Sequence, residues 1–252
     1  MDAITIQILR NKVASLVDEM HYHFYRSGYS TIIRESRDFS CVILDREGRL
    51  IVAPPMFFHA PVYRHLVGRI LKLYGGNDAI KDGDVFVSNH PYEGGLPHVS
   101  DMAFVAPVFA AGGIVAFAGS IAHKADVGGA VAGSTSADAT EMFHEGLLVP
   151  PIKIVDAGGA QTDVERIILT NSRQPTLLRG DILRELVCAE KLISAAQEFT
   201  GGELEDPILR GIDKDDPIAR NPCLRRGPLS LEFWTRLPGQ LWRSTRRLVG
   251  VN

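Results

Sequence analysis

The chain has 252 residues, of which 45% are hydrophobic and 23% are charged, a composition typical of a globular protein. Its formal net charge of -3, with acidic and basic residues interspersed, argues against a nucleic-acid partner. No stretch approaches the ~20 consecutive apolar residues that cross a bilayer, and the N-terminus carries no signal-peptide pattern. The widely spaced Cys41, Cys188 and Cys223 indicate neither a disulfide framework nor a thiolate zinc site. We therefore expect a cytoplasmic protein with no nucleic-acid or membrane partner.

The first third of the chain carries helical and strand patterns in turn. Apolar residues recur every three or four positions from Ile4 to about Gly28, which predicts an amphipathic helix. Asp38 to Val52 holds two apolar runs around a polar turn that ends in glycine, the pattern of a β-hairpin. A second helix is predicted from about Val62 to Tyr74, because two glycines follow it. Asp84 to Ser88 then predicts a short strand.

Two glycine-rich polar loops flank an apolar hairpin in the middle of the chain. Residues Asn89 to Asp101 are rich in Pro and Gly, which predicts a loop. Strands are predicted from about Met102 to Phe109 and from Ile114 to Ile121, joined by a glycine turn. A second loop runs from His123 to Gly133. Because the two loops bracket one hairpin, they could converge at the same end of a sheet.

The remaining elements complete an α+β pattern. A strand is predicted from Leu147 to Val155, a helix near Thr162 to Thr170, and an amphipathic helix from Asp181 to about Phe199. Because the strands come in hairpins, we predict an α+β fold in which a mixed, mainly antiparallel sheet packs with helices. Residues 1–202 would form one domain, and the Pro- and Arg-rich residues 203–252 a divergent extension.

Two His-x-x-Asp motifs, one beside each end of the apolar hairpin, are the clearest chemical signal. Imidazole nitrogen and carboxylate oxygen are ligands of Zn, Mn and Fe. One interpretation is therefore a divalent metal site formed by His98, Asp101, His123 and Asp126. The other is that each aspartate braces its own loop by accepting backbone N–H groups, while each histidine makes an ordinary hydrogen bond. Spacing alone does not choose between them.

Glu145 is the candidate catalytic residue. It lies in a polar segment just ahead of an apolar strand pattern, and a carboxylate near a metal or in an apolar pocket can act as a general base. Glu145 is also a candidate further ligand, and it could instead pair with Lys124. His59 and His65 flank a turn and the helix after it, so we expect both to be structural histidines.

The loop after the predicted Asp84 strand is a candidate substrate-binding segment. Asn89 and Tyr92 would contact the substrate, and backbone amides near Gly94 and Gly95 would meet an anionic intermediate. The alternative is a tight turn with a packed aromatic ring. The chain holds no glycine-rich phosphate loop of the P-loop type, so any ATP would be bound by another chain.

Several of these motifs occur in the order seen in the hydantoinase B/oxoprolinase family, which this chain resembles from roughly Ile4 to Leu192. That family includes the B subunit of N-methylhydantoinase, the C-terminal part of 5-oxoprolinase, and the large subunits of acetone and acetophenone carboxylases. The motifs are Asp38-Phe39-Ser40-Cys41, the run Asn89 to Asp101, Ala122 to Gly129, Gly133-Ser134, and Glu145 to Pro151.

The resemblance implies a subunit of an ATP-dependent cyclic-amide hydrolase that opens the ring of a hydantoin or 5-oxoproline. It also implies a hydantoinase A-type partner that uses the ATP, hence a hetero-oligomer, and a divalent metal on the His-x-x-Asp residues. His90 and Lys124 depart from the commonest family pattern, which leaves the substrate open. The alternatives are the large subunit of an ATP-dependent ketone carboxylase and a truncated, non-catalytic fragment or assembly subunit, because the resemblance ends near Gly201.

Overall fold

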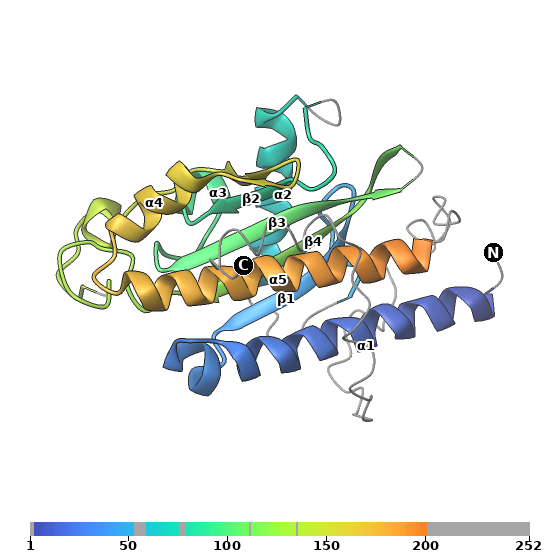
Figure 1. Cartoon of the computed structure of the whole chain (residues 1–252), viewed down its shortest axis with the longest axis horizontal. Helices are drawn as coiled ribbons and strands as arrows, with labels where there is room; N and C mark the ends of the chain where they lie inside the picture. The colour runs from blue at the N-terminus through green and yellow to red at the C-terminus, as the bar shows by residue number, and fades with distance from the viewer. Residues whose placement is uncertain (1–2, 53–58, 76–78, 111, 135, 201–252) are drawn as a thin grey trace, which may run out of the picture.

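The structure is a computed structural model that describes residues 3–52, 59–75, 79–110, 112–134 and 136–200 (Figure 1). Its centre is a six-stranded sheet of order β1-β4-β3-β2-β5-β6, in which all neighbouring strands are antiparallel. The α+β prediction is therefore confirmed. The strands are β1 (Phe39–Asp45), β2 (Val85–Ser88), β3 (Asp101–Ala110), β4 (Gly113–His123), β5 (Ile152–Asp156) and β6 (Gly159–Ala160).

Helices cover both faces of this sheet. The long helices α1 and α5 run side by side on one face, and α2 covers the other (Figure 1). A short π-helix (Ile32–Ser36) links α1 to β1, and a 3-10 turn (Met142–His144) precedes β5. The helices are α1 (Ala3–Ser27), α2 (Ala60–Leu73), α3 (Pro91–Gly94), α4 (Thr162–Thr170) and α5 (Pro175–Thr200).

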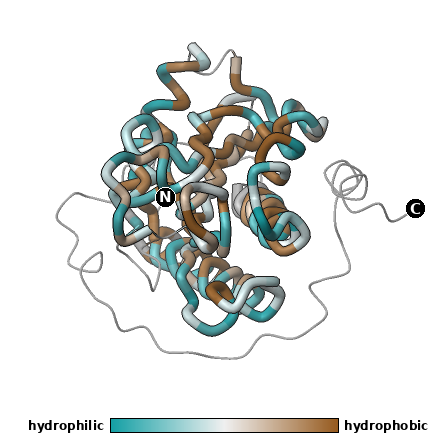
Figure 2. The backbone as a smooth tube through the Cα atoms, turned by 90° about the vertical axis from the view of Figure 1, so that its left-hand side faces the viewer, coloured by the Kyte–Doolittle hydropathy of each residue, from teal (hydrophilic) through white to brown (hydrophobic). Residues whose placement is uncertain are grey.

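Strand alternation divides the core between the two faces. Successive strand side chains point to opposite sides of a sheet, so β1 sends Cys41 and Ile43 toward α1 and α5, and Val42 and Leu44 toward α2. In the view of Figure 2, hydrophilic and hydrophobic stretches alternate along the helices, as expected for elements with one buried side. Burial on both faces fixes the register of the central hairpin, and that hairpin carries the candidate site.

Four local predictions need correction. The predicted Asp38–Val52 hairpin has only its first strand, because Asp45 ties down a tight turn and the second arm keeps a single bridge at Leu50. The strand predicted over 147–155 begins at Ile152, since Leu147 and Val149 bond to a loop and a side chain instead. The predicted loop over 89–101 contains the short helix α3. Helix α5 begins at Pro175, before Asp181.

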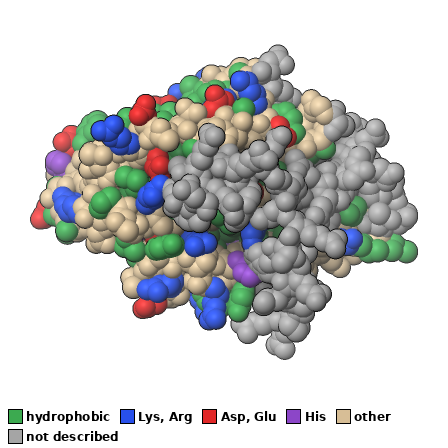
Figure 3. Space-filling model, in the orientation of Figure 1, with side chains coloured by type: hydrophobic (Ala, Val, Ile, Leu, Met, Phe, Trp, Pro, Cys, Tyr) green, Lys and Arg blue, Asp and Glu red, His purple; other side chains and the backbone are tan. Residues whose placement is uncertain are grey.

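The described surface carries both signs of charge. Lys and Arg side chains lie among Asp and Glu side chains on the part of the molecule that Figure 3 shows in colour. Within the described ranges, no helix combines the length and the apolar character needed to cross a bilayer. The predicted extension over 203–252 lies outside the described residues.

Candidate metal and catalytic site

The central hairpin brings the predicted metal ligands to one end of the sheet. Asp101 is the first residue of β3 and His123 the last of β4, and the two are paired in the antiparallel register. His98 lies three residues before Asp101, in a turn whose Asp101 N–H donates to the His98 carbonyl at 3.2 Å. Hairpin register and a local turn therefore place these three side chains together.

The three side chains form a compact cluster. The Asp101 carboxylate lies between the histidines, with Oδ2 3.5 Å from His98 Nε2 and Oδ1 3.4 Å from His123 Nδ1. One potential ligand atom from each residue lies within 4.8 Å of the other two. Asp38, just before β1, places its Oδ2 3.7 Å from His123 Nδ1. The cluster has the size and the donor types of a divalent cation site.

Asp101 is charged despite being buried. Burial acts to raise the pKa of Asp101, but its contacts with the imidazoles of His123 and His59 and the charge of His98 outweigh that effect and hold the pKa well below its usual value. Its Oδ1 atom and His123 Nδ1 are buried, yet neither completes a hydrogen bond with the described residues. A cation would satisfy both atoms, so these residues fit a divalent metal.

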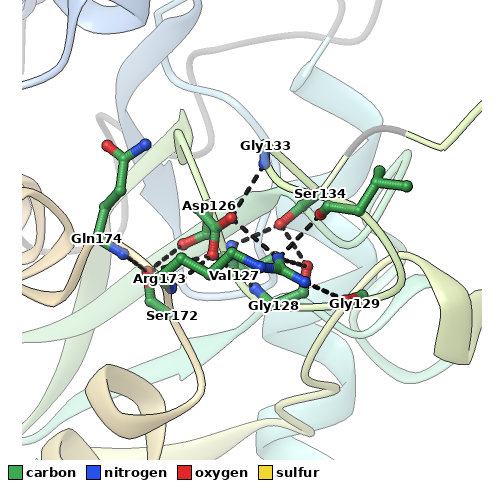
Figure 4. A network of polar contacts seen from close by, with 10 residues as sticks. Asp126, Val127, Gly128, Gly129, Gly133, Ser134, Ser172, Arg173 and Gln174 are labelled. Atoms are coloured by element: carbon green, nitrogen blue, oxygen red, sulfur yellow. Dashed lines mark hydrogen bonds and ion pairs between the residues drawn. The ribbon is translucent and has the colours of Figure 1, made fainter.

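The structure separates Asp126 from this cluster, and the second interpretation of its motif applies (Figure 4). Its carboxylate accepts hydrogen bonds from the backbone N–H groups of Gly128, Gly133 and Arg173 and from the Arg173 guanidinium. Burial acts to raise the pKa of Asp126, but these donors outweigh it and lower the pKa. The prediction of Asp126 as a metal ligand is therefore corrected: the carboxylate braces its own loop.

Arg173 completes this loop network (Figure 4). Its guanidinium donates to the carbonyls of Gly128, Gly129 and Val131, at 3.2, 2.6 and 2.9 Å. The braced loop in turn holds the segment around Glu145, because two backbone hydrogen bonds join 127–130 to 144–147. Gly129, with φ +84°, packs so closely there that an added Cβ would lie 2.5 Å from a backbone oxygen.

Glu145 lies beside the metal cluster. Its Oε2 accepts a hydrogen bond at 3.2 Å from the N–H of Val99, the residue after His98. The alternative pairing with Lys124 is wrong, because Lys124 is fully buried and pairs with Glu185 of α5. Burial raises the pKa of Glu185 to about 8, against the opposing charge of Lys124. Glu145 therefore stays a candidate for chemistry at the cluster.

Asn89 is a structural centre of the site. It is fully buried, and its side-chain amide donates to the carbonyls of Val99 and Leu147 and accepts from the N–H of Val149. Both amide protons and the carbonyl oxygen are thereby engaged. Asn89 joins the end of β2 to the loop that carries His98, so the geometry gives it a positioning role in place of the predicted substrate contact.

The other predicted substrate-binding residues lie on or beside α3. Tyr92 is 77% exposed, so its ring is not packed as the turn alternative required. The N–H of Gly94 donates to the His90 carbonyl within this helix turn, so it is engaged. Gly95 has φ +76° and ends the helix, and an added Cβ there would lie 2.9 Å from the ring of His65.

Sequence reasoning missed two residues at the cluster. His59, expected to be a structural histidine, is fully buried with its Nε2 3.7 Å from Asp101 Oδ2. Asp38, assigned to a polar loop, faces His123. Both approach the hairpin from segments more than 30 residues away, a distance that no local spacing reveals. The one available signal was the family motif that begins at Asp38.

An α+β fold whose sheet end gathers two histidines and a buried carboxylate defines a protein with a candidate metal centre. Comparison gives the family: the description Hydantoinase B/oxoprolinase matches residues 2–202, and the chain belongs to this family. It is 32% identical to a putative D-/L-hydantoinase B-type subunit of Pseudomonas sp. (strain NS671) over 194 residues, which are 75% of this chain and 32% of that protein.

Two further matches agree with the family. The chain is 31% identical to the 5-oxoprolinase of Dictyostelium discoideum over 200 residues, 79% of this chain and 16% of that protein. The crystal structure of an ATP-dependent caprolactamase from Pseudomonas jessenii shares the fold, with a TM-score of 0.73 at 24% identity over 83% of this chain and 36% of that one. The chain thus spans about a third or less of these curated relatives.

Proposed function

We propose that this chain is part of a cyclic-amide hydrolase and that His98, Asp101 and His123 hold a divalent cation at its active site. The observation that carries the proposal is the cluster itself, in which a buried, charged carboxylate lies within 3.5 Å of two imidazole nitrogens. The names of the relatives support the reaction class, since they are a hydantoinase subunit, a 5-oxoprolinase and a caprolactamase.

The proposed roles follow from the contacts. A bound Zn, Mn or Fe ion would supply a Lewis acid that polarises a carbonyl or activates water. Glu145 is the proposed general base, because the bond from Val99 fixes one carboxylate oxygen beside His98 and leaves the other oxygen available. The braced loop of Asp126 and Arg173 keeps the Glu145 segment in place.

The proposed partner is a hydantoinase A-type protein that binds ATP and activates the substrate carbonyl, which makes the active assembly a hetero-oligomer. One relative is named as a single subunit of a hydantoinase, and this name supports the presence of a second, different chain. The substrate would be a hydantoin or 5-oxoproline. Tyr92, exposed on α3, remains a proposed contact for the substrate, and the backbone near Gly95 remains a second one.

The test is ATP-dependent ring opening of hydantoin and 5-oxoproline by the full chain combined with the A-type partner. Glu145→Gln keeps an oxygen for Val99, so it should retain metal while turnover falls about 10²- to 10⁴-fold. Glu141→Gln, an exposed neighbour, is the matched control and should keep its rate. Equal rates for both variants would remove Glu145 as the base. Bicarbonate fixation onto a ketone, without ring opening, would favour the carboxylase alternative.

A further inference from the structure

His59 precedes α2 and contacts both β1 and the first residue of β3. Its imidazole is fully buried, with Nδ1 3.3 Å from Ser40 Oγ and Nε2 3.7 Å from Asp101 Oδ2. The three mutually close ligand atoms of the candidate metal site come from His98, Asp101 and His123. His59 therefore meets this site at the carboxylate of Asp101.

A buried hydroxyl pair fixes the other side of the His59 ring. The Tyr63 hydroxyl, from α2, lies 2.8 Å from Ser40 Oγ and donates to the Ser40 carbonyl at 3.1 Å. Ser40 Oγ is in turn within reach of His59 Nδ1. An ionised carboxylate only accepts hydrogen bonds, so the arrangement favours the tautomer in which Nε2 carries the proton toward Asp101 and Nδ1 accepts from Ser40.

The two oxygens of Asp101 face different neighbours. Oδ2 is approached by His59 and His98, at 3.7 and 3.5 Å, whereas Oδ1 faces His123 at 3.4 Å. A proton donor on Oδ2 limits rotation of the carboxylate and keeps Oδ1 directed toward His123. Groups that orient a metal-binding side chain in this way commonly change metal affinity by about 10- to 100-fold.

We propose that His59 is a positioning residue, held by Ser40 and Tyr63, that orients the Asp101 carboxylate for metal binding. The inference rests on the proposed metal site. It assigns a role to a histidine that spacing alone marks as structural, and it explains why polar side chains from β1 and α2 lie buried next to the cluster.

The test is isothermal titration of the metal-free full chain with Zn²⁺, together with Co²⁺ absorption spectra. His59→Leu removes the donor and should weaken Zn²⁺ binding about 10- to 100-fold while the metal-free melting temperature stays near wild type. His59→Gln places an amide N–H near the position of Nε2 and should recover most of the affinity. Tyr63→Phe should give a smaller loss. His65→Leu, the same change at an exposed histidine of α2, should leave binding unchanged.

The outcomes separate the inference from the site on which it rests. Tight wild-type binding that His59→Leu leaves unchanged would overturn the positioning role and keep the metal site. A His59→Gln variant as weak as His59→Leu, with an altered Co²⁺ spectrum, would make His59 a direct ligand and also overturn it. A wild-type chain that binds no Zn²⁺ would remove the metal site and the inference together.

Discussion

Replacing Asp126 by Asn tests whether this residue braces a loop or binds a metal. The Asn oxygen can still accept from Gly128 and from the Arg173 N–H, but its NH₂ would then face the two donors on Oδ2, Gly133 N and Arg173 Nη1. Each donor left without an acceptor costs about 1–3 kcal/mol. Because Arg173 is 44% exposed and can bond to water instead, we expect a total loss of about 2–3 kcal/mol.

Urea unfolding followed by circular dichroism measures this loss in the metal-free chain. Asp138→Asn, an exposed aspartate in the same loop region, is the matched control and should change the free energy of unfolding by less than about 0.5 kcal/mol. The lowered pKa of Asp126 means that its stabilisation is present above the ordinary pKa of 3.8 and is lost as the pH falls through the folded-state pKa. The variant should therefore approach wild type in acid. A variant of unchanged stability that no longer binds metal would refute the brace.

Two further changes probe packing and charge near the site. Gly129→Ala should destabilise the chain by more than Gly112→Ala, because both have φ above +80° but the added Cβ meets backbone at 2.5 Å only at Gly129; equal losses in urea unfolding would contradict that contact. Lys124→Met should cost about 3–5 kcal/mol by leaving Glu185 buried without its partner, whereas exposed Lys72→Met should cost under about 0.5 kcal/mol; a small Lys124 effect would show that the pair is not needed.

The central hairpin shows what a sequence reveals. Apolar alternation and the Gly112-Gly113 turn predict β3 and β4, and their register then pairs Asp101 with His123. The His-x-x-Asp spacing adds His98 through a local turn. Three of the four predicted ligands therefore follow from short-range rules. The fourth, Asp126, fails because the same spacing equally suits an aspartate that accepts the N–H groups of its own loop.

Contacts between distant segments account for what the sequence could not supply. The fate of Lys124 depends on Glu185, which is 61 residues away on α5, and no local pattern pairs the two. His59 reaches Asp101 only because α2 packs on the sheet face that carries Ser40. Asn89 looks like a loop residue in sequence, yet burial and three segments of backbone make it a structural centre.

The most direct test of the proposed metal site is the metal content of the full chain. After removal of metal by chelation, titration with Zn²⁺ should show one ion per chain for wild type. That binding should be lost in His123→Ala and in Asp101→Asn but kept in Asp126→Asn, because Asp126 lies outside the cluster. Unchanged stoichiometry and affinity in His123→Ala, or no binding by the wild-type chain, would contradict a metal centre at His98, Asp101 and His123.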